Sequence, residues 1–423
     1  MSSSVFDLSA FNLSLGKPEA FDFGFEVAPQ EPQESSHYWK VPDKDQYLTS
    51  LALNPFDGLC AIASGASENN LFIYEINTNN AGASYNGKSL THHLTITLPK
   101  IQSIAWVPAN TGLGSSGNVV ITGHKNGMVN MTKLPQSYSS DSPAEIVQRF
   151  NHMHHLSPSS ASTRIKHLEL VVEGSTVSYI GTICSDHVFL WDPSRWDIPK
   201  LKLKQKGINC LHVCPQRPRI AAFGGRKGIS IADFRKPTNT LSPPEYNSSA
   251  VTMVKWSSLD ENLVAAVDIE NVVKIWDIRY SKPQSTYDSH VDTISGLEWS
   301  TDHPSDLVTA SYDGTIRVWN MHEHKEPSKR QPLSVAQKWA QSESWKNFQH
   351  RHSEVYSSRP NFSDRPTVSQ SNRQFYGMKL FNGDALTIDS KGFFGYHKVS
   401  TSPSTPTIST SEGSVDGDFS PPR

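Results

Sequence analysis

His290, Thr309, Asp313 and Trp319 bring an imidazole, a hydroxyl, a carboxylate and an indole together within residues 289–320. A hydroxyl, a histidine and a carboxylate are the parts of a nucleophilic triad, so acyl transfer is the first chemistry to weigh. The same groups can instead satisfy one another's hydrogen bonds within a sheet. The elements that carry these residues decide between the two interpretations.

Residues 289–320 are predicted to form three antiparallel strands. Apolar residues alternate with polar ones in TISGLEW, DLVTAS and TIRVWN, and YDG supplies a tight turn between the last two. The four side chains then lie near the ends and on the inner face of one small sheet, where they can pair with one another. A buried, fully paired network has no open face for substrate, so we expect a structural network and no catalytic residue.

The first of these strands recurs along the chain. Its pattern of apolar, x, x, apolar, x, apolar has seven copies, which begin at Leu48, Ile101, Ile165, Ile208, Val251, Ile294 and Phe375. From Ile165 to Ile294 each of three consecutive steps is 43 residues, which indicates a repeat architecture. The closing strand also recurs, with Trp-Asp at 191–192 and 276–277 and Trp-Asn at 319–320.

These features resemble the WD40 repeat family, with its Trp-Asp dipeptide, its period of about 40–45 residues and its four-stranded blade. The resemblance covers roughly residues 37–399, is strongest over 165–320, and implies an all-β fold, a seven-bladed propeller. It also implies that His290, Thr309, Asp313 and Trp319 form the family's stabilising hydrogen-bond tetrad, complete only in this blade. The other dipeptide positions depart from the motif and hold Tyr74-Glu75, Thr132-Lys133, Ala232-Asp233 and His397-Lys398. Loops rich in Asn and Ser favour a fungal member of the family.

Length and composition predict one repeat domain with two tails. A seven-bladed ring needs about 300 of the 423 residues, and the hydrophobic fraction of 36% is low because of polar tails and insertions. We predict a disordered acidic and aromatic tail over 1–36, the propeller over 37–399, and a disordered Ser/Thr/Pro-rich tail over 400–423. The ring must close, and residues 37–41 (HYWKV) can supply the fourth strand of the last blade.

The insertion and the tails contain candidate binding segments. The insertion, about residues 325–370, interleaves basic residues with aromatic ones such as Trp345. One interpretation is that the insertion is a loop that packs on the propeller and includes an outer strand near PLSVAQKW at 332–339. The alternative is that it forms a site for an acidic partner or RNA. Phe21, Phe23 and Phe25 of the acidic tail suit a docking peptide. Ser402, Thr405 and Ser420 each precede proline and are candidate phosphosites.

Charge and cysteine content limit which partners and which cellular compartment are expected. A net charge of −2 gives no general attraction to nucleic acid or anionic membrane, and no apolar run is long enough for a membrane span. Four cysteines in so long a chain do not suggest a disulfide scaffold. We therefore expect a cytoplasmic protein, also nuclear, and not a secreted one.

Two histidine-containing segments raise the question of a metal. Period-two alternation places Cys210, His212 and Cys214 on one face of a strand, but a fourth zinc ligand is not evident. The segment NHMHH contributes His152, His154 and His155 from an insertion, as a weaker candidate. Packing and exposed polar positions explain both, so we expect no metal and no cofactor.

Function must then be sought on the surface, because this fold hosts many unrelated roles. We expect a non-enzymatic scaffold or adaptor that binds other proteins in a complex, without a small-molecule substrate. The alternative is a substrate receptor of a cullin-type ubiquitin ligase, because WDIR at 276–279 resembles the Trp-Asp-x-Arg box of such receptors. Trp276, Asp277 and Arg279 are the residues concerned, and Arg235 in ADFR belongs to a weaker copy. Asp277 and Arg279 can also cap a strand.

Overall fold

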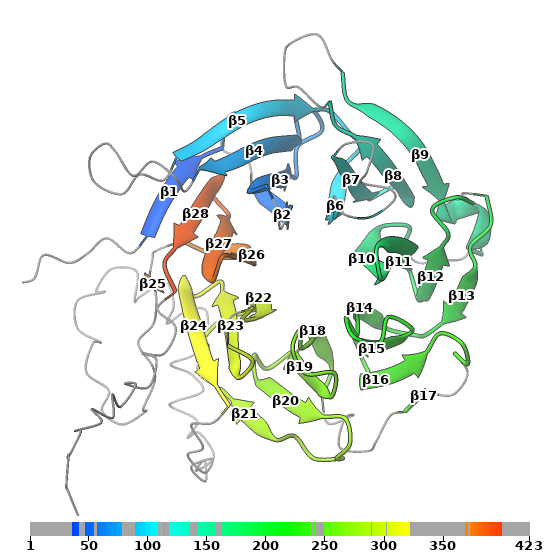
Figure 1. Cartoon of the computed structure of the whole chain (residues 1–423), viewed down its shortest axis with the longest axis vertical. Coiled ribbons are helices and arrows are strands. Elements are labelled where there is room, and N and C mark those ends of the chain that lie inside the picture. The colour runs from blue at the N-terminus through cyan, green and yellow to red at the C-terminus, as the bar shows by residue number, and fades with distance from the viewer. Residues whose placement is uncertain are drawn as a thin grey trace, which may run out of the picture. The chain divides into compact units, whose positions relative to one another are not determined.

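The structure is a computed structural model that describes residues 36–41, 47–321, 369–370 and 373–399, with shorter gaps inside these ranges, the longest at 78–88, 112–117, 136–142 and 242–248. Seven four-stranded antiparallel sheets follow one another around a ring (Figure 1). The prediction of a seven-bladed β-propeller is therefore confirmed. We number the blades 1–7 in chain order.

Blades 1–3 contain twelve strands and the 3-10 helix of the described chain. Blade 1 consists of β2 (Leu48–Leu53), β3 (Leu59–Ser64), β4 (Leu71–Asn77) and β5 (Ser89–Ile96). Blade 2 consists of β6 (Ile101–Val107), β7 (Val119–His124), β8 (Met128–Lys133) and β9 (Glu145–Asn151), and the helix η1 (His152–His155) follows it. Blade 3 consists of β10 (Ile165–Glu173), β11 (Thr176–Cys184), β12 (His187–Trp191) and β13 (Leu201–Lys204).

Blades 4–7 complete the ring, and the last of them takes its outer strand from the start of the chain. Blade 4 consists of β14 (Ile208–Val213), β15 (Ile220–Gly225), β16 (Gly228–Asp233) and β17 (Thr240–Leu241). Blade 5 consists of β18 (Val251–Trp256), β19 (Leu263–Asp268), β20 (Val273–Asp277) and β21 (Ser285–Tyr287). Blade 6 consists of β22 (Ile294–Trp299), β23 (Asp306–Ser311), β24 (Thr315–Asn320) and β25 (Ser369–Gln370), and blade 7 of β26 (Phe375–Phe381), β27 (Asp384–Asp389), β28 (Phe393–His397) and β1 (Ser36–Lys40).

The repeat pattern marks the innermost strand of every blade. Each copy begins at the first residue of β2, β6, β10, β14, β18, β22 or β26, and each of these first residues is at most 3% exposed. Neighbouring inner strands contact one another all the way around the ring. The apolar core lies between blades: Trp256 of blade 5, for example, packs with Ile231 of blade 4. Burial between blades explains why the apolar pattern repeats once per blade.

Blade 7 joins the two ends of the described chain. Strand β1 pairs antiparallel with β28, with Tyr38 opposite Gly395 and Trp39 opposite Phe394. The guanidinium of Arg373 lies 4.8 Å from the ring centre of Tyr38 and 4.0 Å from that of Phe393. Because of this pairing, the β28 edge of the last blade is covered by a strand from the start of the propeller.

The outer strand of blade 6 in the described chain is short. Strand β25 pairs with Thr315 and Ile316 of β24, so Ser369 and Gln370 lie at the outer edge there. A strand of two residues has too little periodicity to be recognised in the sequence. The outer strand expected near residues 332–339 lies outside the described residues and stays a prediction. Within the described ranges, no helix is long and apolar enough to cross a membrane.

Candidate functional site

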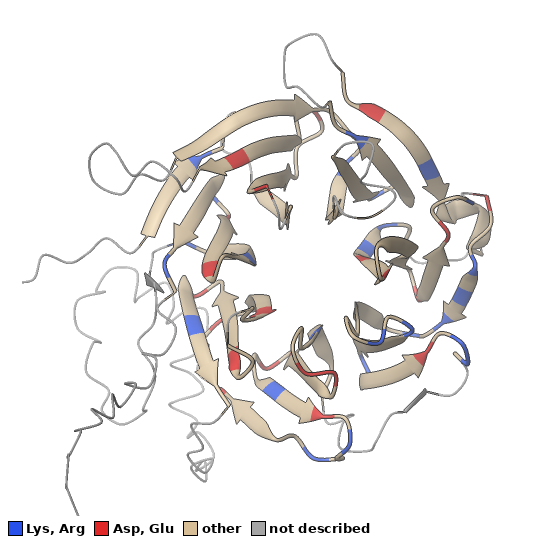
Figure 2. Ribbon diagram, in the orientation of Figure 1, with Lys and Arg blue, Asp and Glu red and all other residues tan. Residues whose placement is uncertain are grey.

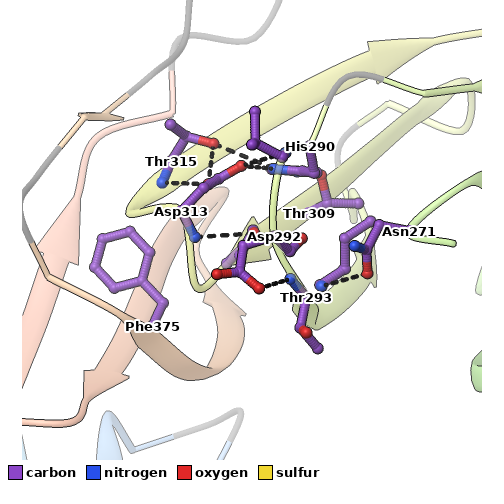
Figure 3. A network of polar contacts seen from close by, with 12 residues as sticks. Asn271, His290, Asp292, Thr293, Thr309, Asp313, Thr315 and Phe375 are labelled. Carbon is purple, nitrogen blue, oxygen red and sulfur yellow. Dashed lines mark hydrogen bonds and ion pairs between the residues drawn. The ribbon is translucent and has the colours of Figure 1, made fainter. Parts of the chain in front are cut away.

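The four residues first singled out form one hydrogen-bonded chain in blade 6. Trp319 Nε1 donates to Thr309 Oγ1 over 2.9 Å, and Thr309 Oγ1 lies 2.7 Å from His290 Nε2. His290 Nδ1 lies 3.0 Å from Asp313 Oδ2, which also accepts from the Val291 amide. Figure 3 shows the imidazole of His290 between Thr309 and Asp313. The carboxylate accepts from Nδ1, so the Thr309 hydroxyl donates to Nε2 and every polar group is used.

The turn between β23 and β24 positions Asp313 in this network. Gly314 follows it with φ +78°, a conformation that glycine adopts without strain. Burial alone would raise the pKa of the Asp313 carboxyl, but hydrogen bonds from His290 and Thr315 lower it to about 2. Thr309 is fully buried, and the side chain of His290 has no exposed surface. A hydroxyl so enclosed and paired cannot reach a substrate, and this geometry favours the structural interpretation over the triad.

A second network of the same kind was missed in the sequence. In blade 3, Trp191 Nε1 donates to His152 Nε2 over 2.9 Å, and Thr182 Oγ1 lies 2.7 Å from the same nitrogen. His152 Nδ1 lies 3.0 Å from the Gly127 carbonyl oxygen, which takes the acceptor role that Asp313 has in blade 6. His152 thus lies in the core, while the sequence suggested only a weak metal ligand.

In two further blades a histidine is hydrogen-bonded to a threonine hydroxyl. His124 Nε2 lies 3.0 Å from Thr122 Oγ1, and His397 Nε2 lies 2.8 Å from Thr387 Oγ1. His397 occupies the Trp position of blade 7, and its Nδ1 lies 3.0 Å from Ser36 Oγ on β1. Burial lowers the pKa of His397 and of His152 to about 3, and that of His124 to about 4, so these imidazoles are neutral at neutral pH.

Replacing Trp319 with Ala is expected to lower the free energy of unfolding by about 3 kcal/mol, because a large, partly buried ring is lost and Thr309 loses a donor. Trp319→Phe keeps most of the apolar area and should cost about 1 kcal/mol. Urea unfolding of both variants and the parent measures this. A Trp319→Ala protein that unfolds like the parent would contradict the structural role.

A ring of ionisable side chains lines five consecutive inner strands. They stand at the same position of β10, β14, β18, β22 and β26, and are Glu169, His212, Lys255, Glu298 and Lys379. Lys255 Nζ lies 3.2 Å from one carboxylate oxygen of Glu298, and Lys379 Nζ lies 2.5 Å from the other. His212 Nε2 lies 3.5 Å from Glu169 Oε1. In blades 1 and 2 the same position holds Ala52 and Ala105.

The charges of this ring compensate one another. Burial alone would raise the pKa of Glu298, but the two lysines lower it to about 2; Glu169 is held at about 2 in the same way by His212 and its neighbours. Burial lowers the pKa of His212 to about 4. In the wider molecule, positive and negative residues are interspersed around the ring (Figure 2). The ring therefore joins neighbouring blades through the ion pairs of Glu298 with Lys255 and Lys379, and through the contact of Glu169 with His212, an imidazole that is neutral at neutral pH.

The two candidate arginines of the ligase-type box fold back onto their own strands. Arg279 Nε lies 2.9 and 3.1 Å from the two carboxylate oxygens of Asp277, and Arg235 Nε lies 2.9 and 3.0 Å from those of Asp233. Both arginine side chains stay 62% exposed. Trp276 is buried and belongs to the apolar core between blades 4 and 5. Of the box, only the arginine presents an exposed surface, and its carboxylate partner is already supplied by the chain.

Arg235, unlike Arg279, lines a cavity. This cavity has a volume of about 450 Å³ and is lined by Glu173, Gly174, Arg217, Pro218, Arg219, Ile220 and Arg235. Arg219 pairs with Glu173 at 3.0 Å and Arg217 with Glu261 at 3.2 Å. The surface that lines the cavity is almost entirely apolar, and its three arginines are each held in an ion pair.

The candidate metal ligands of β14 have partners of other kinds. Cys210 and Cys214 pack in the core between blades 4 and 5. His212 contacts Glu169 of blade 3 through Nε2 and accepts from the Trp256 amide of blade 5 through Nδ1. In the second segment, His152 is buried in its network, His154 Nε2 contacts Asn151 and His155 Nε2 contacts the Asp197 carbonyl. The described residues contain no group of three or more such side chains that could hold a metal ion.

Several candidate residues lie outside the described residues: Trp345, Phe21, Phe23, Phe25, Ser402, Thr405 and Ser420. Their roles in docking and phosphorylation stay predictions from the sequence.

Comparisons with known proteins agree with this architecture. A family model described as the DSE1 N-terminal domain matches residues 43–402. Protein DSE1 of Yarrowia lipolytica is 34% identical over 427 residues, which cover 89% of this chain and 57% of that protein. Protein DSE1 of Scheffersomyces stipitis is 30% identical over 312 residues, which cover 68% of this chain and 44% of that protein.

A shorter match connects the chain to WD repeats. A WD repeat-containing protein of Dictyostelium discoideum is 28% identical over 131 residues, which cover 30% of this chain and 7% of that protein. The resemblance to fungal WD-repeat proteins is thus confirmed. The chain spans about half the length of the curated fungal relatives described above.

Proposed function

Since the chain belongs to the family of DSE1 N-terminal domains, we propose that it is a non-enzymatic scaffold that holds partner proteins together inside the cell. The observation that carries this proposal is a closed ring whose His, Thr, Trp and Asp side chains are hydrogen-bonded to one another. Such a ring is a rigid support, and its turns and edges are free to bind. All four cysteines are buried free thiols, in keeping with a reducing compartment.

The cavity beside Arg235 supports an interaction role. Apolar walls with a few polar groups are typical of the pockets that receive anchoring side chains of a partner. The three arginines of the lining are held by ion pairs to Glu173, Asp233 and Glu261, so they are ordered before a partner arrives. We infer that this cavity belongs to a partner-binding face.

The ligase-receptor role is the finer alternative, and Arg279 discriminates it from a plain scaffold. Its guanidinium is exposed, so Arg279→Ala should leave the thermal midpoint unchanged. If the receptor role holds, loss of this contact should weaken binding of a ligase adaptor about tenfold or more. Because the guanidinium of Arg279 is already hydrogen-bonded to the Asp277 carboxylate, we expect no ligase adaptor to bind and the other partners to be retained.

Affinity purification of the full chain with quantitative mass spectrometry tests both roles. Three tagged forms are compared: the parent, Arg279→Ala, and Arg235→Ala as its matched counterpart one blade earlier. A scaffold predicts a reproducible set of partners with the parent and with Arg279→Ala, and loss of some partners with Arg235→Ala. A ligase adaptor retained by the parent and lost only with Arg279→Ala would favour the receptor. Absence of any stable partner would contradict the proposed function.

A further inference from the structure

The inner strands share a local irregularity that re-aims one side chain per blade. In all seven, the ladder with the second strand shifts register between the first and third residues. The residue in between is left out of the regular alternation, as at a β-bulge. In blades 5 and 6 this residue is Thr252 or Ser295, whose hydroxyls contact backbone carbonyls.

In blades 1, 2, 3 and 7 the bulged residues instead meet in a cavity. They are Thr49, Gln102, Lys166 and Tyr376. The cavity has a volume of about 470 Å³ and is completed by Tyr47, Leu48, Arg164, Ile165 and Tyr312. We call it the aromatic–basic cavity. It lies where β2, β6, β10 and β26 begin, beside the turn between β23 and β24.

Its charge is of one sign. Arg164 and Lys166 line it, and no Asp or Glu does. Lys166 Nζ donates to the Ile208 carbonyl over 3.1 Å, and no described carboxylate forms an ion pair with either cation. In the cavity beside Arg235, by contrast, every arginine of the lining has a carboxylate partner. The aromatic–basic cavity thus offers two cations whose negative partner must come from elsewhere.

Its walls supply aromatic surface and further donors. The rings of Tyr312 and Tyr376 lie 4.9 Å apart at 39°. Tyr47 lies so close to Gly65 that a Cβ there would be 2.2 Å from its ring, so only glycine allows this placement. The buried hydroxyl of Thr49 has no hydrogen-bond partner among the described residues. Phenols, a free hydroxyl and two cations together suit a ligand with anionic oxygens.

We propose that the aromatic–basic cavity binds an acidic peptide segment of a partner protein, with Arg164 and Lys166 holding a carboxylate or phosphate group and the tyrosines packing against the peptide. This inference deepens the proposed scaffold function and rests on it. Arg164 provides a planar fork of donors for the anionic group, and Lys166 adds a point charge. A site with two cations is too small for a nucleic-acid backbone, whose binding depends on many phosphate contacts.

Binding of fluorescent peptides to the full chain, followed by anisotropy, tests the proposal. The probes are a glutamate-rich peptide, its glutamine counterpart and a counterpart with one phosphoserine. The protein forms are the parent, Arg164→Glu, Arg164→Lys and Lys227→Glu. Lys227 is the matched control because it is an exposed lysine in the turn of blade 4 that corresponds to the turn of Tyr312. Circular dichroism melts verify that all forms are folded.

The parent should bind an anionic probe about tenfold or more tightly than the glutamine peptide, and salt should weaken this binding. Arg164→Glu should abolish the preference, Arg164→Lys should retain part of it, and Lys227→Glu should retain all of it. Preference for the phosphoserine peptide alone would assign the anion as phosphate. Equal binding of all three peptides, or an unchanged preference in Arg164→Glu, would overturn the proposal. Partners retained in affinity purification despite that result would leave the scaffold function standing.

Discussion

Removing residues 1–41 is expected to lower the free energy of unfolding by about 5 kcal/mol, whereas removing residues 1–34 should leave it unchanged. The longer deletion takes away Tyr38 and Trp39 of β1 and Val41, which follows it, and each of these packs against blade 7 or its neighbour. Burying one such side chain contributes roughly 1.5–3 kcal/mol. The Gly392 carbonyl also loses the Val41 amide as a donor, and His397 loses its Ser36 partner.

Urea unfolding of the two truncated forms and the full chain measures this difference. Size-exclusion chromatography provides a second readout, because deletion of β1 exposes β28 as an unpaired edge that can pair with another copy. The shorter deletion is the control for the loss of the tail itself. Identical unfolding midpoints and identical elution of the two truncated forms would show that β1 does not stabilise the ring.

A shift from about pH 7.5 to about pH 5.5 should destabilise the protein by about 5 kcal/mol. His124, His152 and His397 are fully buried and His212 is nearly so, with pKa values of about 4, 3, 3 and 4. In the unfolded chain these imidazoles take up protons near pH 6.5, but in the folded protein they do not until the pH falls much further. The unfolded state therefore binds more protons below pH 6.5, and each histidine costs about 1.4 kcal/mol at pH 5.5.

Urea unfolding at the two pH values tests this, with His397→Gln as the comparison. The variant removes one of the four titrating groups, so its loss of stability over the same interval should be smaller by about 1.4 kcal/mol, whatever its stability at pH 7.5. The depressed pKa values of Glu169 and Glu298 add a further loss only below about pH 4.5, as these carboxylates become protonated. A free energy of unfolding that does not change between the two pH values would contradict this account.

The fold was predictable because one local pattern repeats. The first apolar residue of each copy, such as Ile208 or Ile294, faces the core between blades, and every blade needs a buried apolar residue at this position. The blade 6 residues were also identifiable together, because Thr309, Asp313 and Trp319 stand at the ends of adjacent strands and His290 shortly before them.

Other parts of the site depend on contacts that the sequence does not display. His152 precedes its partner Thr182 by 30 residues, while His290 precedes Thr309 by 19. Because this connection is longer, the sequence did not show that His152 and Thr182 form the same His–Thr pair. The spacing of Thr182 and Trp191, nearly that of Thr309 and Trp319, was the signal that could have revealed it. The charge ring and the aromatic–basic cavity assemble residues from different blades, and the bulges that aim them depend on strand register.

Because β1 pairs with β28, the ring cannot close until the ribosome has made almost the whole propeller. Ser36 is separated from His397 by 361 residues, so the first strand of the ring is synthesised long before its partner. At about 5–20 residues per second this interval lasts roughly 20–70 s. Throughout it, Trp39 and Val41 have no blade 7 to pack against, while blades 1–6 can already form with their neighbours. Strand β1 therefore stays unpaired until β28 has been synthesised, and the propeller becomes a closed ring only after its last blade has left the ribosome.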